Sequence, residues 1–258
     1  MALNRPITDW RGQRVWLIGA SSGIGAALAQ ALYVHGASVA LSARRGAELD
    51  KQIALLDAAR ACALPLDVTD VASIATAEQA LISRWGAYDS VVMLAGDYVP
   101  QSVADFNLAS VQHILATNLG GIYNTLALVL PRLRAAGHGG LVLVSSVAGY
   151  RGLPRSLAYG PSKAALHNLA EALYLELKDS GIAVTLVNPG FVRTPLTANN
   201  PFPMPAMITP EQAAAAIVTG LARGAFEIHF PRRFTYVMKA LALLPAPVYL
   251  RLMRWLTR

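Results

Sequence analysis

The sequence has little of what secretion, membrane insertion or disulfide formation would require. Cys62 is the only cysteine among 258 residues, so no disulfide can form within the chain. The first ten residues, MALNRPITDW, lack the apolar core of a signal peptide. No apolar run reaches the roughly eighteen residues that span a bilayer, and the stretch 240–250 is short and contains two prolines. These absences predict a cytoplasmic location.

Internal repeats, low-complexity segments and linkers are also missing from the sequence. With 54% hydrophobic residues, the composition is that of a well-buried globular protein rather than a disordered one. We therefore predict a single domain over residues 1–258.

Short apolar segments alternate with helix-forming segments along most of the chain. The pattern predicts strands at 15–19, 39–43, 63–67, 90–95, 141–145 and 183–188, with a helix over 26–35 after the first strand. Apolar strands that alternate with helices imply a parallel sheet covered on both faces. The predicted fold is α/β, a doubly wound, Rossmann-like sheet in which ligands bind beyond the carboxyl ends of the strands.

A glycine loop follows the first predicted strand. Gly19, Gly23 and Gly25 allow the backbone to turn tightly and to approach a pyrophosphate, which the N-terminus of the next helix attracts. The loop lacks the Gly-Lys-Ser/Thr of a P-loop. A plain structural turn is the alternative interpretation, but the position directly after a strand favours a dinucleotide site.

Tyr159 and Lys163 lie four residues apart, thirteen residues after Ser146. On a helix, this spacing puts the phenol and the ammonium on one face, where the cation is expected to lower the pKa of the phenol. Ser146 and Tyr159 can both donate hydrogen bonds to a developing alkoxide. The alternative is an ordinary helix surface, but the order of the motifs predicts a nicotinamide-dependent reductase.

These motifs resemble those of the short-chain dehydrogenases/reductases, and the resemblance covers residues 1–195. Its further elements are Leu-Asp-Val-Thr-Asp at 66–70, Ala95-Gly96, Asn118 and Asn-Pro-Gly-Phe-Val-Arg-Thr at 188–194. The resemblance implies that Tyr159 protonates the substrate oxygen and that Ser146 orients it. It further implies that Lys163 binds the nicotinamide ribose and that Asn118 holds a water in the proton path, although Asn118 could instead cap or bend its helix.

The predicted cofactor site combines these motifs, and no metal is expected in it. By resemblance, Asp67 and Val68 flank the adenine, whereas Pro189, Gly190 and Thr194 flank the nicotinamide carboxamide. The full set is Gly19, Ser21, Ser22, Gly23, Ile24, Gly25, Arg44, Asp67, Val68, Ala95, Gly96, Tyr159, Lys163, Pro189, Gly190, Val192 and Thr194. The resemblance also implies a homodimer or homotetramer, with helices that start near Val103 and Ser162 packing between subunits.

Two positions depart from the family pattern. Ile18 stands where threonine is common, and Met93-Leu94-Ala95-Gly96 stands where relatives have Asn-Asn-Ala-Gly. In relatives these polar side chains support the cofactor loop, so the departures put that support in doubt but leave the Ser146, Tyr159 and Lys163 group intact.

The second predicted strand ends in Ala43-Arg44-Arg45, which bears on the choice of cofactor. A carboxylate at this place would bind a ribose 2′-hydroxyl, whereas an arginine accommodates a 2′-phosphate. The planar guanidinium of Arg44 suits a phosphate, so we predict NADP(H). Alternatively, both arginines are solvated surface charges.

The C-terminal segment 223–258 is a basic, apolar extension that we expect to be helical. It holds seven basic residues and only one acid, Glu227, and so carries +6 of the net charge of +7. This mixture predicts peripheral contact with an anionic membrane. Packing over the substrate pocket or across a subunit interface is equally compatible, whereas the apolar density argues against nucleic acid.

The substrate is expected to be a lipophilic ketone, aldehyde or alcohol. A loop at 196–210 is predicted to close the pocket with Phe202, Met204 and Met207, which offer adaptable apolar contacts. A non-catalytic NADP(H)-binding redox sensor is the main alternative, because a sensor needs the glycine loop but not the proton donor. An epimerase or dehydratase would be expected to have a larger C-terminal region.

Overall fold

The protein forms a seven-stranded parallel sheet. The computed structural model describes residues 2–198 and 203–256. The strands are β1 (Arg14–Ile18), β2 (Ser38–Ser42), β3 (Ala61–Ala63), β4 (Ser90–Met93), β5 (Gly139–Val144), β6 (Ile182–Pro189) and β7 (Glu227–Phe230), in the order β3-β2-β1-β4-β5-β6-β7. Every neighbouring pair is parallel. The strand order reverses between β1 and β4, which is where sheets of this kind bind ligands.

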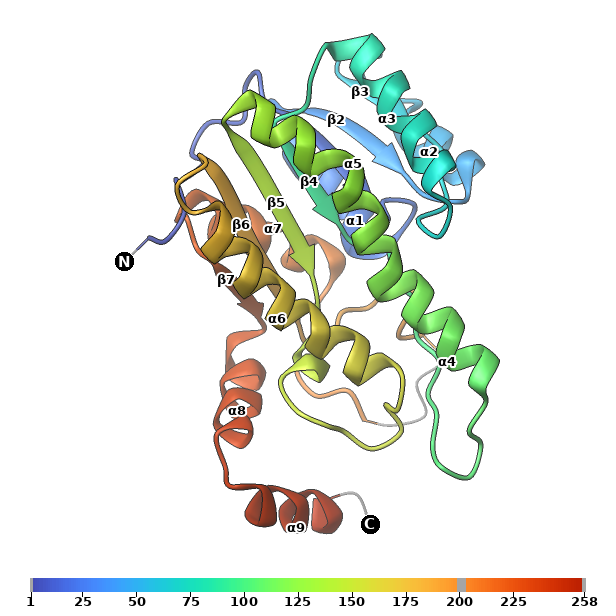
Figure 1. Cartoon of the computed structure of the whole chain (residues 1–258), viewed down its shortest axis with the longest axis vertical. Coiled ribbons are helices and arrows are strands. Elements are labelled where there is room, and N and C mark those ends of the chain that lie inside the picture. Colours follow the sequence, from blue (N-terminus) through green and yellow to red (C-terminus); the bar gives the residue numbers. More distant parts are fainter. Residues whose placement is uncertain (1, 199–202, 257–258) are drawn as a thin grey trace.

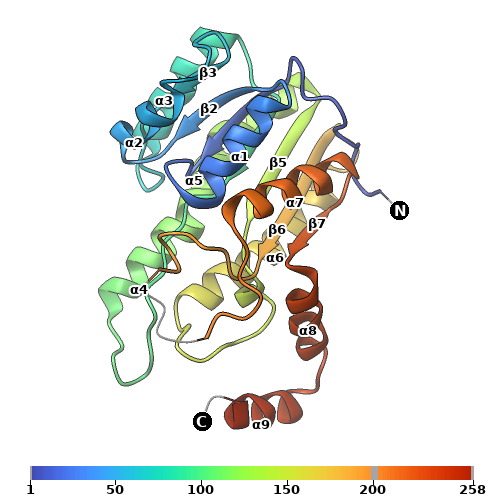
Figure 2. The same ribbon diagram turned by 180° about the vertical axis from the view of Figure 1, so that it is seen from behind.

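Helices cover both faces of the sheet. One face carries α3 (Val71–Trp85), α5 (Gly121–Ala136) and α6 (Tyr159–Leu177), which lie in front in Figure 1. The other carries α1 (Gly23–Val34), α2 (Gly46–Ile53) and α7 (Pro210–Ala222), and α1 and α7 lie in front in Figure 2. Trp16 and Ile18 of β1 enter the first core, whereas Val15 and Leu17 enter the second. The alternation of side chains along a strand thus builds two cores from one apolar run.

The helix that carries Asn118 is interrupted by one wider turn. α4 (Leu108–Leu115) continues through a π-helical turn, Ala116–Gly120, into α5. The continuous helix Leu108–Ala136 is long and apolar enough to cross a membrane by length and composition alone. No unbroken apolar run marks this helix in the sequence, so it was not predicted as a candidate span. Ile122, Leu126 and Val129 on α5 lie in the core against the sheet, as expected of a helix that covers a sheet face.

Two strands differ from the sequence prediction. The third strand is found at Ala61–Ala63 rather than 63–67, and Pro65, which has no amide hydrogen, lies beyond its end. The strand β7 was missed because Glu227 and His229 alternate with Ile228 and Phe230, so no continuous apolar run marks it. The first helix begins at Gly23, three residues before its predicted start, so the last glycines of the loop form its first turn.

Two further helices follow β7. α8 (Arg232–Ala242) continues beyond the carboxyl end of β7, and α9 (Ala246–Leu256) runs across it at the lower end of the molecule in Figure 1. The predicted helical extension is therefore present. It lies at the same edge of the sheet as the loops that follow β1, β4 and β5 (Figures 1 and 2).

Candidate active site

A cavity of about 600 Å³ opens at the carboxyl ends of β1, β4 and β5. All seventeen residues predicted to bind the cofactor line it, and so does Ser146. Among the predicted catalytic and cofactor-binding residues, Asn118 alone does not line the cavity. Its neighbour Thr117 does. The cavity is large enough for a dinucleotide and a small substrate only if it stays open to solvent along one side.

The glycine loop forms a cradle that packs too closely against neighbouring backbone to accept side chains at two of its positions. A Cβ atom on Gly19, where φ is +103°, would lie 2.4 Å from the Ala95 amide nitrogen, and one on Gly25 would lie 2.3 Å from the Gly19 carbonyl oxygen. Only glycine fits at these two positions. The backbone of the loop is therefore exposed to the cavity at the N-terminus of α1, where its amide groups suit a pyrophosphate.

Backbone contacts support this loop despite the departures at Ile18 and Leu94. The Ile18 carbonyl accepts hydrogen bonds from the amides of Leu94 at 2.8 Å and Ala95 at 2.9 Å. Gln52 on α2 donates to the Ala20 carbonyl at 2.8 Å. Main-chain hydrogen bonds thus join the end of β1 to the segment after β4 at these two positions.

Two arginines that follow β2 lie at the end of the cavity beside the glycine loop. Arg44 and Arg45 are exposed and both line the cavity wall. Nη2 of Arg45 donates to the hydroxyls of Ser21 at 3.2 Å and Ser22 at 3.4 Å, and so reaches across to the glycine loop. Sequence reasoning selected Arg44 and omitted Arg45, although the adjacent position and identical chemistry were a sufficient signal.

Ser146 and Tyr159 meet at the catalytic end of the cavity. Tyr159 is the first residue of α6, and its pKa is affected by a side-chain hydrogen bond with Ser146. The neighbouring Ser145 is buried, and its hydroxyl donates to the Lys163 carbonyl at 2.8 Å. Because that hydroxyl is engaged within the fold, Ser146 is the serine that can assist Tyr159.

Burial controls the titration of this group. It raises the pKa of Tyr159 to about 12, against the opposing hydrogen bond from Ser146, and it lowers the pKa of Lys163 to about 8. Lys163 Nζ donates to the Val144 carbonyl at 3.0 Å and lies 5.7 Å from the centre of the Tyr159 ring. The prediction that Lys163 lowers the Tyr159 pKa is wrong for this structure, because desolvation outweighs the distant cation. Tyr159 is therefore a protonated phenol at neutral pH.

Asn118 lies behind the cavity wall at the π-helical turn. It is fully buried, its Oδ1 accepts from the Asp97 amide at 2.7 Å, and its Nδ2 donates to the Asp97 carbonyl and to Ser162 Oγ. The carboxylate of Asp97, in turn, contacts His113 at 2.9 Å. Asn118 thus fixes the segment after β4, and the wider turn that presents it is a feature often found at functional sites.

Tyr98 was not predicted from the sequence but lies beside Tyr159, the predicted proton donor. Its ring meets that of Tyr159 edge to face, with the ring centres 4.9 Å apart, and it lines the cavity. Burial raises its pKa, so it too is a neutral phenol at pH 7. No sequence pattern indicated Tyr98, because it follows β4 in a segment without regular periodicity.

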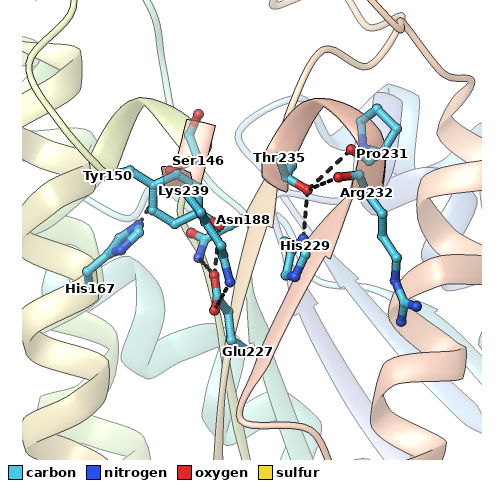
Figure 3. A network of polar contacts seen from close by, with 10 residues as sticks. All are labelled: Ser146, Tyr150, His167, Asn188, Glu227, His229, Pro231, Arg232, Thr235 and Lys239. Carbon is cyan, nitrogen blue, oxygen red and sulfur yellow. Dashed lines mark hydrogen bonds and ion pairs between the residues drawn. The ribbon is translucent and has the colours of Figure 1, made fainter. Parts of the chain in front are cut away.

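A polar network centred on Glu227 joins the sheet to α8 (Figure 3). The carboxylate of Glu227 accepts hydrogen bonds from Tyr150 at 2.7 Å and Asn188 at 2.8 Å, and it pairs with Lys239. Burial opposes the charge, but these three donors hold the pKa of Glu227 below its usual value. The network ties the segments that follow Ser146 and precede Pro189 to one carboxylate.

The predicted substrate loop contributes less to the cavity than expected. Leu196 and Thr197 of this loop line the cavity, whereas Met204 and Met207 do not. Phe202 lies outside the described residues. Within the part of the chain that the structure describes, no residue of α8 or α9 lines the cavity either, so the helix pair does not cover the pocket.

The chain was compared with known proteins. The model of the short chain dehydrogenase family matches residues 13–202. An uncharacterized oxidoreductase of Myxococcus xanthus is 36% identical over 236 residues, covering 90% of this chain and 92% of the relative. The ketoacyl reductase HetN of a Nostoc species is 30% identical over 228 residues, covering 86% and 79%.

Solved structures share the fold. A short-chain dehydrogenase from Streptomyces avermitilis has a TM-score of 0.79 at 28% identity and covers 95% of this chain and 97% of its own. A 3-ketoacyl-(acyl-carrier-protein) reductase from Brucella melitensis, complexed with NADH, has a TM-score of 0.79 at 22% identity and covers 86% and 98%. On the family match and the relatives of 30% identity or more, this chain belongs to the short-chain dehydrogenase/reductase family of oxidoreductases.

Proposed function

We propose that the protein is an NADP(H)-dependent oxidoreductase that interconverts a lipophilic ketone or aldehyde and the corresponding alcohol. The observation that carries the proposal is the neutral phenol of Tyr159, which is hydrogen-bonded with Ser146 in the wall of a cavity built for a dinucleotide. The glycine cradle and the two arginines fit the cofactor chemically.

The side chains of the site divide the work of carbonyl reduction. A bound reduced nicotinamide supplies hydride to the carbonyl carbon. Tyr159 donates a proton to the carbonyl oxygen, and Ser146 donates a hydrogen bond that holds this oxygen in place. Lys163, whose pKa of about 8 leaves it mostly charged at pH 7, lines the cavity beside Tyr159 and can hold the ribose of the cofactor. For the reverse reaction, Tyr159 must first lose its proton, and its pKa of about 12 makes this unfavourable.

The preference for NADP(H) is supported by charge at the adenosine end. Arg44 and Arg45 offer two guanidinium groups to a 2′-phosphate at the end of β2, where a carboxylate would be expected for NAD(H). Arg45 is already directed toward the glycine loop by Ser21 and Ser22. A phosphate placed between the arginines would receive hydrogen bonds from both.

The surroundings of Tyr159 favour a lipophilic substrate. Tyr98, Pro100, Val192 and Leu196 contribute apolar surface to the cavity. Two of the compared proteins are named as ketoacyl reductases, which makes 3-ketoacyl thioesters a useful class to test.

Oxidation of NADPH by the full chain tests this proposal. The substrates are lipophilic ketones and aldehydes together with 3-ketoacyl thioesters, and Tyr159→Phe is assayed in parallel. We expect turnover with at least one compound, lowered about 10²- to 10⁴-fold in Tyr159→Phe, with NADPH bound equally well by both proteins. Binding of NADPH without turnover of any compound would favour a redox sensor instead.

A further inference from the structure

The helix pair α8–α9 presents a large apolar surface to solvent. Leu243 is 86% exposed and Trp255 71% exposed, values far above those of apolar side chains in the two cores. The exposed apolar side chains of the pair are Tyr236, Val237, Leu243, Val248, Leu250, Trp255 and Leu256. An apolar patch on this scale indicates a surface that meets another apolar phase.

Arginines lie among these apolar side chains without neutralising partners. Arg232 and Arg233 are exposed on α8, and Arg251 and Arg254 are exposed on α9. In the described part of the chain, no ion pair involves any of the four. The single acid of the segment, Glu227, is already shared by Lys239, Tyr150 and Asn188. The positive charge of the surface is therefore uncompensated.

The helix pair is held against the body in a fixed orientation. Nη1 of Arg151 donates to the carbonyls of Leu241, Ala242 and Leu244 at the end of α8, and its guanidinium lies over the ring of Tyr249, 4.2 Å from the ring centre. The Tyr249 hydroxyl donates to the Gly152 carbonyl at 2.6 Å. The contacts of Arg151 and Tyr249 thus fix the helix pair on the body, while the apolar side chains named above remain exposed to solvent.

We propose that the outer surface of α8–α9 binds the anionic surface of a lipid bilayer. Helices that lie in the membrane interface combine apolar and aromatic residues with arginine or lysine, and the charge attracts anionic headgroups. Trp255 beside Arg251 and Arg254 has this composition, since tryptophan is favoured at the headgroup level. Contact with a bilayer would turn the carboxyl edge of the sheet, and with it the cavity, toward the lipid (Figure 1).

A second copy of the chain fits this surface less well. A two-fold interface would place the same four arginines of each copy near one another, with no acid in the segment free to compensate them. A solvated nucleic acid groove would leave Leu243 and Trp255 unused. An anionic bilayer satisfies both the charge and the apolar area.

Flotation with vesicles tests the proposal on the full chain, with no need for turnover. The vesicles are phosphatidylcholine alone or phosphatidylcholine with about one third phosphatidylglycerol. We expect the protein to float with the anionic vesicles at low salt, and binding to fall at least tenfold at about 0.5 M NaCl. The double variant Arg251→Glu/Arg254→Glu should lose binding, and Trp255→Ser should weaken it.

The matched control is Arg5→Glu/Arg134→Glu, which changes the net charge equally. Both arginines are exposed and lie at the opposite edge of the sheet, near the start of β6 and in the last turn of α5. This control should float like the wild type, and far-ultraviolet circular dichroism should show all variants folded. The proposal would be overturned if the protein did not float at low salt, or if the control variant lost binding equally. It would also be overturned if Arg251 and Arg254 were needed for an oligomer or a nucleic acid complex but not for binding to vesicles.

Discussion

The body of the protein, taken as the chain before residue 223, and the helix pair α8–α9 differ in where their polar and apolar side chains lie. In the body, buried polar groups such as Asn118 and Ser145 have hydrogen-bond partners, and the sequence before residue 223 carries a net charge of only +1. In the helix pair, four arginines stand unpaired beside exposed apolar side chains. The difference supports two proposals: the body binds a small molecule in its cavity, whereas the helix pair binds a surface outside the protein.

The two adjacent serines after β5 give the largest expected effect within the body. Ser146→Ala removes a donor to the substrate oxygen and should lower kcat about 10²- to 10³-fold. Ser145→Ala is the matched control, since its hydroxyl bonds to the Lys163 carbonyl instead, and it should change kcat less than about tenfold. Steady-state kinetics of both variants measure the effect. Equal losses of kcat would show that the assignment of Ser146 as the donor to the substrate oxygen is incorrect.

The arginines after β2 should govern the choice between cofactors. Arg44→Ala/Arg45→Ala should weaken NADPH binding about tenfold to a hundredfold and leave NADH binding nearly unchanged, because only NADPH carries the 2′-phosphate. Dissociation constants from fluorescence titration measure the effect, with Arg134→Ala as the control. If the wild type binds both cofactors equally, the proposed preference is wrong.

We expect the buried, charged Lys163 to lower the free energy of unfolding at neutral pH. Its pKa is about 8 in the folded protein and 10.5 as its ordinary value, so the unfolded chain binds more protons between these pH values. The stability of the wild type should therefore rise from pH 8 to pH 10.5. Lys163→Met should be more stable than the wild type below pH 8, by on the order of 2 kcal/mol after loss of the hydrogen bond to Val144.

Urea unfolding at several pH values measures this effect. In Lys163→Met, the rise between pH 8 and pH 10.5 should be smaller by about 3 kcal/mol, because the full pKa difference of Lys163 is lost at about 1.4 kcal/mol per pH unit. The variant should also be inactive, so a stabilised protein without turnover would show that the body accepts a cost in stability for its chemistry. A less stable Lys163→Met protein at pH 7 would contradict this interpretation.

The smallest effect concerns the junction between the two regions. Arg151→Ala removes the donor to the last carbonyls of α8 and should destabilise the attachment of the helix pair by about 1–2 kcal/mol. Hydrogen exchange should become faster in α8 and α9 but not in β4 or β5. Arg155→Ala, in the same connecting segment, is the control, and equal acceleration there would remove the special role of Arg151.

Most of the body was predictable because its signals are local. Apolar runs indicated six of the strands, and the motif spacings placed Gly19, Tyr159 and Lys163 on one cavity without knowledge of the topology. Asp97 and Tyr98 were missed because their contribution depends on how loops from separate strands meet. The titration of Tyr159 was misjudged because the sequence shows the neighbouring lysine but not the burial of both groups. For the tail, composition indicated its helices, but the contacts of Arg151 and Glu227 that fix them are long-range.

Glu227 makes the C-terminal helices difficult to remove by shortening the gene. A protein that ended before Arg232 would retain a half-buried carboxylate beside Tyr150 and Asn188 while losing Lys239, its only charged partner among the described residues. The same cut would expose Gly190, against which Phe234 packs. Loss of the helix pair in a descendant of this protein would therefore require a compensating change at position 227. We expect Glu227 and Lys239 to vary together for the same reason.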